Sequence, residues 1–226
     1  MIELLEKAKN AWVPDCFGST NGDDYNDTLS EMDRQFYQYK TAWGCTQYVV
    51  MDKSNNLVVK FPFDGMWHDD CDDKEYWEKQ DYIEDKDGRV FEEFPRDYSE
   101  ISYILYKKAE DAGVVDMFAH TEKVEGGRNV FYAQEFVTPL DSVWDDDDFS
   151  ENSKNIVWEK RKSKEFGWWT FDEAWLAKAV DVYGCEKVEK FMAFIKRECL
   201  DDWHDGNYGY RQDGTPAVLD WAGFYD

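Results

Sequence analysis

Hydrophobic and polar positions along the first 40 residues predict one helix followed by a loop. Apolar side chains recur at helical spacing from Met1 to Val13, and Pro14 follows them. We therefore expect a packing helix that ends at this proline. Residues 15–31 are rich in Gly, Asn, Asp and Ser, which predicts a loop before a short element near residues 32–39. Residues 1–40 should form an N-terminal extension of helix and loop.

The pattern changes to strands after residue 40. Apolar runs over residues 41–51 and 57–61 flank a polar stretch at residues 52–56, which favours a β-hairpin. Two further strands are expected over residues 117–124 and 129–137, because a short segment with two glycines separates two apolar runs there.

A helix is expected between these two pairs of strands. Asp97 or Ser99 can cap its start, and Gly113 can end it. The apolar positions between them recur at helical spacing: Ile101, Ile104, Leu105 and Ala109. Residues 41–137 thus predict an antiparallel sheet with one helix, interrupted by an acid-rich insertion over residues 62–95.

The last third of the chain predicts helices followed by a hairpin. Residues 141–169 are expected to be an irregular linker, in which the four aspartates 145–148 could pair with the basic block 160–164. Residues 170–200 show helical periodicity and predict two helices that break at Tyr183-Gly184. Asp213-Gly214 then predicts a turn between two short strands near residues 208–211 and 217–219. The predicted fold class is α+β.

Composition indicates a folded, strongly acidic protein. The 226 residues carry 26 basic and 50 acidic side chains, a net charge of −24, and 18% of them are aromatic. A disordered acidic tail would lack these aromatic residues. The negative charge repels phosphate, so direct nucleic-acid binding is disfavoured and a partner with a basic surface is favoured. The acidity could itself be the function, as in a protein that mimics DNA, or could serve solubility alone.

Cysteine usage and hydropathy indicate a cytoplasmic location, in the host cytoplasm if the protein is viral. The five cysteines contain no C-x-x-C pair, so neither a disulfide framework nor a zinc site is predicted. His68 and Cys71 lie among carboxylates, which we interpret as a solvated charged face and not a metal site. The first residues do not resemble the charged and then apolar start of a signal peptide, and no apolar run of 18 or more residues predicts a membrane span.

Three polar residues near the end of the chain have the spacing of a phosphoryl-transfer site. Such a site needs a carboxylate near the attacking hydroxyl and two oxygen ligands for the Mg²⁺ that bridges the ATP phosphates. Asn207 follows Asp202 by five positions, and Asp220 follows Asn207 by thirteen. The intervening hairpin would bring Asn207 and Asp220 to one place. The alternative is that this Asp-, Asn- and Gly-rich stretch makes only a surface turn.

This stretch resembles the D-x-H-x-G-N loop of small-molecule kinases, atypical kinases and, most closely, the serine/threonine kinases of T7-type bacteriophages. The resemblance implies a two-lobed, protein-kinase-like fold whose N-lobe is residues 41–137. Residues 138–226 would be a reduced, mainly helical C-lobe that ends just after the D-F-G equivalent. Leu200 replaces the usual His before the catalytic Asp, and Trp221 replaces the Phe of D-F-G. Trp221, Phe224 and Tyr225 are expected to fold back as an apolar plug.

The resemblance also assigns the residues that bind ATP. Lys60 follows Leu-Val-Val and matches the Lys that binds the α- and β-phosphates, and Glu100 would be its ion-pair partner. Gly44 is the one glycine in the region of the Gly-rich loop, where Thr46 could add its hydroxyl. The alternatives are that Lys60 is a solvent-facing strand residue and that Glu100 only favours the start of a helix.

The remaining assignments concern adenine, the metal and the substrate. By the resemblance, Gln134 is the gatekeeper, and the backbone of Glu135 and Val137 meets the adenine edge. Asp202 would act on the substrate hydroxyl, while Asn207 and Asp220 would ligate Mg²⁺. His204 and Gly206 would shape the loop.

The predicted function is therefore ATP- and Mg²⁺-dependent phosphoryl transfer to Ser/Thr of a host protein. Two alternatives stay open. One is a pseudokinase, suggested by the sparse Gly-rich loop and Leu200, and the other is an acidic protein that sequesters a host partner without catalysis.

Overall fold

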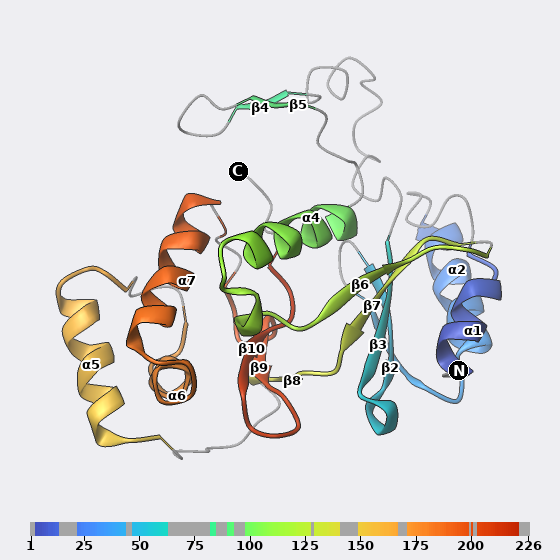
Figure 1. Cartoon of the computed structure of the whole chain (residues 1–226). Coiled ribbons are helices and arrows are strands. Elements are labelled where there is room, and N and C mark those ends of the chain that lie inside the picture. The colour runs from blue at the N-terminus through green and yellow to red at the C-terminus, as the bar shows by residue number, and fades with distance from the viewer. Residues whose placement is uncertain are drawn as a thin grey trace. The chain divides into compact units, whose positions relative to one another are not determined.

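The computed structural model shows an α+β fold with an antiparallel sheet and, in the residues it describes, six α-helices (Figure 1). The described residues are 3–13, 22–43, 47–62, 82–84, 90–92, 98–127, 129–140, 149–166, 171–198, 200 and 203–221; for 22–28, 62, 82–84, 90–92 and 98–101 the backbone alone is described. The chain forms two compact units. Unit 1 is Met1–Ile101 with Glu122–Gln134, and unit 2 is Ser102–Thr121 with Glu135–Asp226.

These units divide the chain differently from the expected segments. Residues 1–40, which were expected to be an N-terminal extension, fall in the same unit as the sheet. Residues 102–121, which were expected within the N-lobe, belong to unit 2.

Unit 1 is built on a five-stranded sheet with the order β1-β2-β3-β7-β6. The strands are β1 Lys40–Trp43, β2 Gln47–Asp52, β3 Leu57–Pro62, β6 Thr121–Val124 and β7 Phe131–Glu135. Helices α1 Glu3–Asn10 and α2 Gly22–Gln35 lie beside this sheet (Figure 1). Their apolar side chains pack with one face of the sheet in a core that includes Leu4, Ala8, Leu29, Met32, Phe36, Tyr48, Val50, Val59, Phe61 and Phe131.

Helix α2 corrects the prediction of a loop over residues 15–31. Residues 14–21 lie outside the described residues, but the chain is helical from Gly22. Leu29, Met32 and Phe36 are spaced by three and four residues, and all three are buried. The loop-forming composition of residues 22–28 misled the prediction, since the burial of one apolar face outweighs the weak helix propensity of Asp, Asn and Gly.

The turn between β2 and β3 has the predicted position. Residues Lys53–Asn55 form one 3₁₀ turn, and the Asp52 carboxylate accepts hydrogen bonds from Ser54 Oγ and from Asn55 N and Nδ2. Asn56 follows with a left-handed backbone at φ 53°. Asn tolerates this conformation better than most residues because its short polar side chain can bond locally.

The acidic insertion contains one short antiparallel ribbon, β4 Tyr82–Glu84 with β5 Val90–Glu92. The rest of residues 63–97, including His68 and Cys71, lies outside the described residues.

Helix α4 Tyr98–Asp111 confirms the predicted helix, and Gly113 ends it with a φ of +70°. Leu105 and Ala109 are buried as expected, but Ile104 is exposed. The strand predicted over residues 117–124 begins only at Thr121, because Val115–Met117 form a 3₁₀ turn after the helix.

Among its described residues, unit 2 contains most of α4, three further helices and a small sheet. Helices α5 Glu151–Lys162, α6 Glu173–Tyr183 and α7 Cys185–Arg197 surround apolar side chains, and strands β8 Thr138–Pro139, β9 Tyr208–Tyr210 and β10 Pro216–Val218 form a sheet with the order β10-β9-β8. The break between α6 and α7 falls at Gly184, which has a φ of +82°. All the predicted apolar positions of these two helices are buried: Trp175, Leu176, Ala179, Val180, Val188, Phe191, Met192, Phe194 and Ile195.

Helix α5 corrects the prediction of an irregular linker over residues 141–169. Ser150 caps the helix by accepting a hydrogen bond from Ser153 N at 3.2 Å. Two residues of the basic block have partners among the described residues. Lys160 contacts Glu165 and Glu189 at 2.5 Å each, and the Arg161 guanidinium is buried and donates to Phe171 O. The expected partners 145–148 lie outside the described residues.

In the described part of the chain, no helix combines the length and the hydropathy that a bilayer crossing requires.

Candidate phosphoryl-transfer site

The predicted hairpin near the end of the chain is present and tightly built. β9 and β10 pair antiparallel, and the turn between them contains Gly214 with a φ of +82°. Asp213 Oδ1 accepts a hydrogen bond from Thr215 N at 2.9 Å across this turn. On the other side of β9, a Cβ on Gly209 would lie 1.9 Å from Thr138 O. Only glycine allows β8 to approach β9 this closely.

The hairpin brings Asn207 and Asp220 together. The backbone oxygen of Asn207 accepts hydrogen bonds from Leu219 N at 2.9 Å and from Asp220 N at 3.1 Å. Asn207 is buried, with 7% of its surface exposed, and Asp220 is half-buried. Turn chemistry in the sequence therefore predicted this proximity correctly. The role of the two residues as metal ligands stays a prediction.

The donor set fits Mg²⁺. Asn207 and Asp220 offer an amide oxygen and a carboxylate oxygen, which are the hard ligands that Mg²⁺ prefers. Mg²⁺ sites often use only one or two protein groups, because the ion keeps several waters and takes further ligands from substrate phosphates. In the residues that can be described, no group of three or more His, Cys, Asp or Glu side chains forms a metal cage.

The loop before Asn207 is held by short hydrogen bonds. Trp203 Nε1 donates to Leu200 O at 2.7 Å, and Gly206 N donates to His204 Nδ1 at 3.1 Å. Asn207 N donates to His204 O at 2.8 Å. These bonds support the shaping role that was expected for His204 and Gly206. Asp202, the predicted catalytic carboxylate, lies outside the described residues.

Tyr208 anchors the other end of this loop. Its hydroxyl donates to Asp205 Oδ1 at 2.8 Å and accepts from Asp172 N at 3.1 Å. Burial of the ring and the bond to the Asp205 carboxylate raise the pKa of Tyr208 above its ordinary value. The phenol therefore stays protonated and keeps this bond at neutral pH.

The predicted adenine-binding segment packs against the same hairpin. Val137 is buried in a small cluster with Ala119 and Ala217, and β8 pairs with β9 immediately after it. Glu135 N donates to His120 O at 2.9 Å, so the amide hydrogen of Glu135 is already used within unit 2. The two predicted metal ligands and the residues predicted to meet adenine thus belong to one packed structure.

Arg211 links the hairpin to the segments that pack against it. Its guanidinium forms an ion pair with Glu135 and donates to Tyr183 Oη at 2.9 Å. It also donates to three backbone oxygens, those of Pro216 at 3.0 Å, Asp116 at 3.0 Å and Phe118 at 2.8 Å. Arg211 was not predicted from the sequence, because a single Arg after a short strand has the pattern of a surface residue.

Trp221, the residue after Asp220, is buried among aromatic side chains. Its ring is 1% exposed, stacks on Tyr106 with the ring centroids 6.2 Å apart, and meets Phe118 edge-on at 5.1 Å. Its Nε1 donates to Ser102 O at 2.9 Å, and its backbone N donates to Asp220 Oδ1 at 3.0 Å. Trp221 therefore fills the role expected of the apolar plug, whereas Phe224 and Tyr225 lie outside the described residues.

Lys60 lies in unit 1, in the middle of β3, and only 7% of its surface is exposed. The alternative of a solvent-facing strand lysine is therefore wrong. A buried ammonium group is costly unless negative charge or several acceptors surround it.

The sheet face that carries Lys60 also carries two buried glutamines. Tyr48, Val50, Leu57, Val59 and Phe61 belong to the core formed with α1 and α2, so the alternate residues of β2 and β3 lie on the opposite face. Lys60 pairs with Val49 there, and Gln47 and Gln134 share its face and are 5% and 3% exposed. Gln134 is the predicted gatekeeper.

Three predicted site residues of unit 1 lie wholly or partly outside the described residues. Gly44 lies outside the described residues, as does Thr46. Glu100 lies in the first turn of α4, but only its backbone is described. Its pairing with Lys60 therefore stays a prediction.

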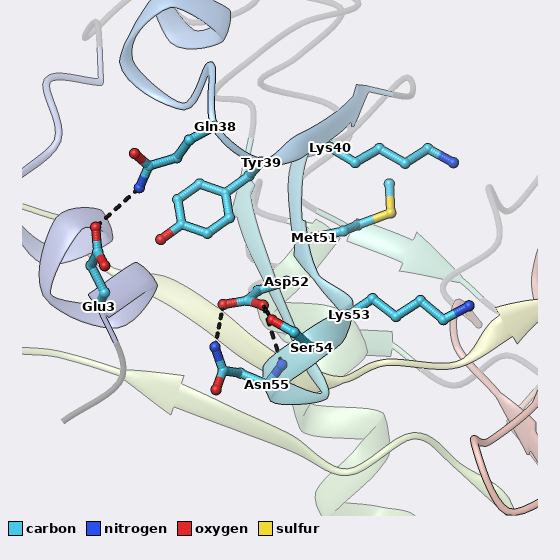
Figure 2. Close-up of a pocket in the computed structure, with 9 residues that line it drawn as sticks. All are labelled: Glu3, Gln38, Tyr39, Lys40, Met51, Asp52, Lys53, Ser54 and Asn55. Atoms are coloured by element: carbon cyan, nitrogen blue, oxygen red, sulfur yellow. Dashed lines mark hydrogen bonds between the residues drawn. The ribbon is translucent and has the colours of Figure 1, made fainter.

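A polar pocket of about 450 Å³ opens elsewhere in unit 1 (Figure 2). Glu3 and Gln38 bond at one end of it at 3.1 Å, and the Asp52 turn forms the other. None of the predicted site residues lines this pocket.

Comparison of the chain with protein-family models, with curated proteins and with solved structures gave no match.

Proposed function

We propose that this protein is an ATP- and Mg²⁺-dependent phosphotransferase that acts on Ser/Thr hydroxyls of a partner protein. The observation that carries the proposal is the approach of Asn207 and Asp220 on a hairpin that also packs against residues 135–139. Two residues with candidate oxygen ligands thus lie on a hairpin that packs against the segment predicted to meet adenine. The buried Lys60 supplies independent support from unit 1.

Each group has a stated task in this proposal. Mg²⁺ held by Asn207 and Asp220 would neutralise charge on the phosphates, and Lys60 would bind their oxygens. Asp202 would orient the attacking hydroxyl and accept its proton. The net charge of −24 favours a substrate whose surface around the hydroxyl is basic, since oppositely charged surfaces associate faster.

The test combines binding and transfer in the same samples. Thermal unfolding is followed with and without MgATP for wild type, Asp220→Asn and Lys60→Met, and then labelled γ-phosphate transfer to a basic Ser/Thr peptide mixture is measured. Asp111→Asn is the matched control, because it removes the same charge from an exposed position at the end of α4. A ligand at about 100 times its Kd stabilises by about 2.7 kcal/mol.

We expect wild type and Asp111→Asn to be stabilised and to transfer phosphate, and Asp220→Asn and Lys60→Met to lose transfer. Stabilisation by MgATP without phosphate transfer would indicate that the protein is a nucleotide-binding pseudokinase and not an enzyme. The absence of any MgATP-dependent stabilisation of wild type would overturn both.

The pseudokinase alternative has one structural observation in its favour. Leu200, which replaces the usual His, is buried and offers no side-chain hydrogen bond to the catalytic loop. The loop instead uses the Leu200 backbone, as the acceptor for Trp203. Transfer in the test above separates the two proposals.

A further inference from the structure

Gln47 is a buried polar residue to which no function has been assigned above. It begins β2, is 5% exposed, and its Oε1 is buried without a hydrogen-bond partner. Leaving a buried acceptor unsatisfied costs stability, so most such atoms in proteins are paired. An unpaired acceptor is therefore a candidate contact for a ligand.

The register of the sheet places Gln47 next to Lys60. Lys60 pairs with Val49 and Pro62 pairs with Gln47, so Gln47 and Lys60 are diagonal neighbours on one face. Diagonal neighbours across two strands are about 7–8 Å apart, which long side chains can bridge through one ligand. The two residues can thus contact the same bound group.

The direction of the strands tells which part of a nucleotide would reach Gln47. β7 runs against β3 (Figure 1), so its end at Gln134 lies toward Leu57, while Gln47 lies at the opposite end, toward Pro62. If adenine meets the chain just after Gln134, a nucleotide that passes Lys60 brings its terminal phosphates toward Gln47.

Phosphate oxygens are acceptors, so they cannot satisfy Gln47 Oε1. The donors that accompany a triphosphate at its terminal end are the waters on its Mg²⁺, because this ion gives up its hydration shell reluctantly. We propose that Gln47 binds the hydrated metal of MgATP, by accepting a hydrogen bond from a metal-bound water beside the phosphates held by Lys60. This inference rests on the proposed nucleotide site and names a further residue of it.

Substitution by Met separates this role from a structural one. Gln47→Met keeps the length of the side chain and removes the unpaired acceptor, so the ligand-free protein should be as stable as wild type or more stable. Gln38→Met, at an exposed position, is the matched control. Binding is measured by titration calorimetry with MgATP, and with ATP in the presence of EDTA.

We expect Gln47→Met to bind MgATP about three- to tenfold more weakly than wild type, as loss of one hydrogen bond implies, and to bind metal-free ATP with unchanged affinity. Lys60→Met should weaken both complexes. If Gln47→Met binds MgATP as tightly as wild type, the inference is overturned while the nucleotide site stands. Equal weakening with and without metal would overturn the contact to a metal-bound water. If wild type binds no nucleotide, the proposed function falls, and the inference falls with it.

Discussion

Replacement of Arg211 should destabilise the hairpin that carries Asn207 and Asp220. Arg211→Met keeps the aliphatic stem but removes the ion pair with Glu135 and the hydrogen bonds to Tyr183 and three backbone oxygens. The side chains of Arg211 and Glu135 are only 18% and 20% exposed, so water can replace these bonds only in part.

The size of the effect follows from this burial. A hydrogen bond to a charged group contributes about 1.5–3 kcal/mol, and breaking a buried ion pair costs about 3–5 kcal/mol because the remaining charge is left without its partner. These values overlap and do not add, so we expect the free energy of unfolding to fall by about 3–5 kcal/mol. Domains of this size have a total of about 5–15 kcal/mol.

Urea unfolding of the whole protein, followed by tryptophan fluorescence, gives this free energy by linear extrapolation. Glu135→Gln and the double variant complete a double-mutant cycle that isolates the pair. If Arg211→Met lowers the free energy of unfolding by less than about 1 kcal/mol, or if Arg211 and Glu135 show no coupling, Arg211 does not stabilise this unit as argued.

Three further predictions test the packing around the site. In urea unfolding, Gly209→Ala should lower the free energy of unfolding several times more than Gly214→Ala, because a Cβ at Gly209 would collide with the backbone of Thr138. A Cβ at Gly214 meets open space, so Gly214→Ala should cost only the roughly 1–2 kcal/mol of a left-handed backbone. Equal losses would contradict the close approach of β8. Burial raises the pKa of Tyr183 to about 12, despite the opposing Arg211, so the folded state holds this proton more tightly than the unfolded state. Stability should therefore fall as pH rises from about 10 to about 12, and Tyr183→Phe, compared by unfolding at each pH, should show a smaller fall. For Glu198, burial opposes ionisation, but the stronger combined effect of Lys108 and Arg197 holds its pKa below the ordinary 4.5. The stabilising effect of this carboxylate is therefore present above pH 4.5 and is lost as pH falls below that value. The free energy of unfolding of Glu198→Gln should thus differ from that of wild type at pH 7 and match it in acid.

Elements with a strong local pattern were predictable from the sequence. The apolar faces of α6 and α7 and the break at Gly184 were correct, because periodicity and a glycine that can adopt positive φ act within a few residues. The hairpin between Asn207 and Asp220 was correct for the same reason, since Asp213-Gly214 sets the turn locally.

Elements that depend on distant residues were not predictable. Helix α5 carries few apolar residues, and its cap is completed by Asp181, which accepts from the Ser150 and Ser153 hydroxyls 31 and 28 residues away in sequence. The partners of Arg211 lie up to 95 residues away. No local pattern in one sequence can report such contacts, and the basic and acidic compositions around them indicated solvated surface instead.

The route of the chain through the two units has a consequence for cooperativity. The sequence passes from one unit to the other after Ile101, after Thr121 and after Gln134, and the first of these crossings falls inside the single helix α4. Neither unit is therefore one continuous segment: a cut after Ile101 divides unit 1, a cut after Gln134 divides unit 2, and a cut after Thr121 divides both. We expect the intact protein to unfold in one transition, and we expect circular permutation to be a safer route than truncation for dissecting it.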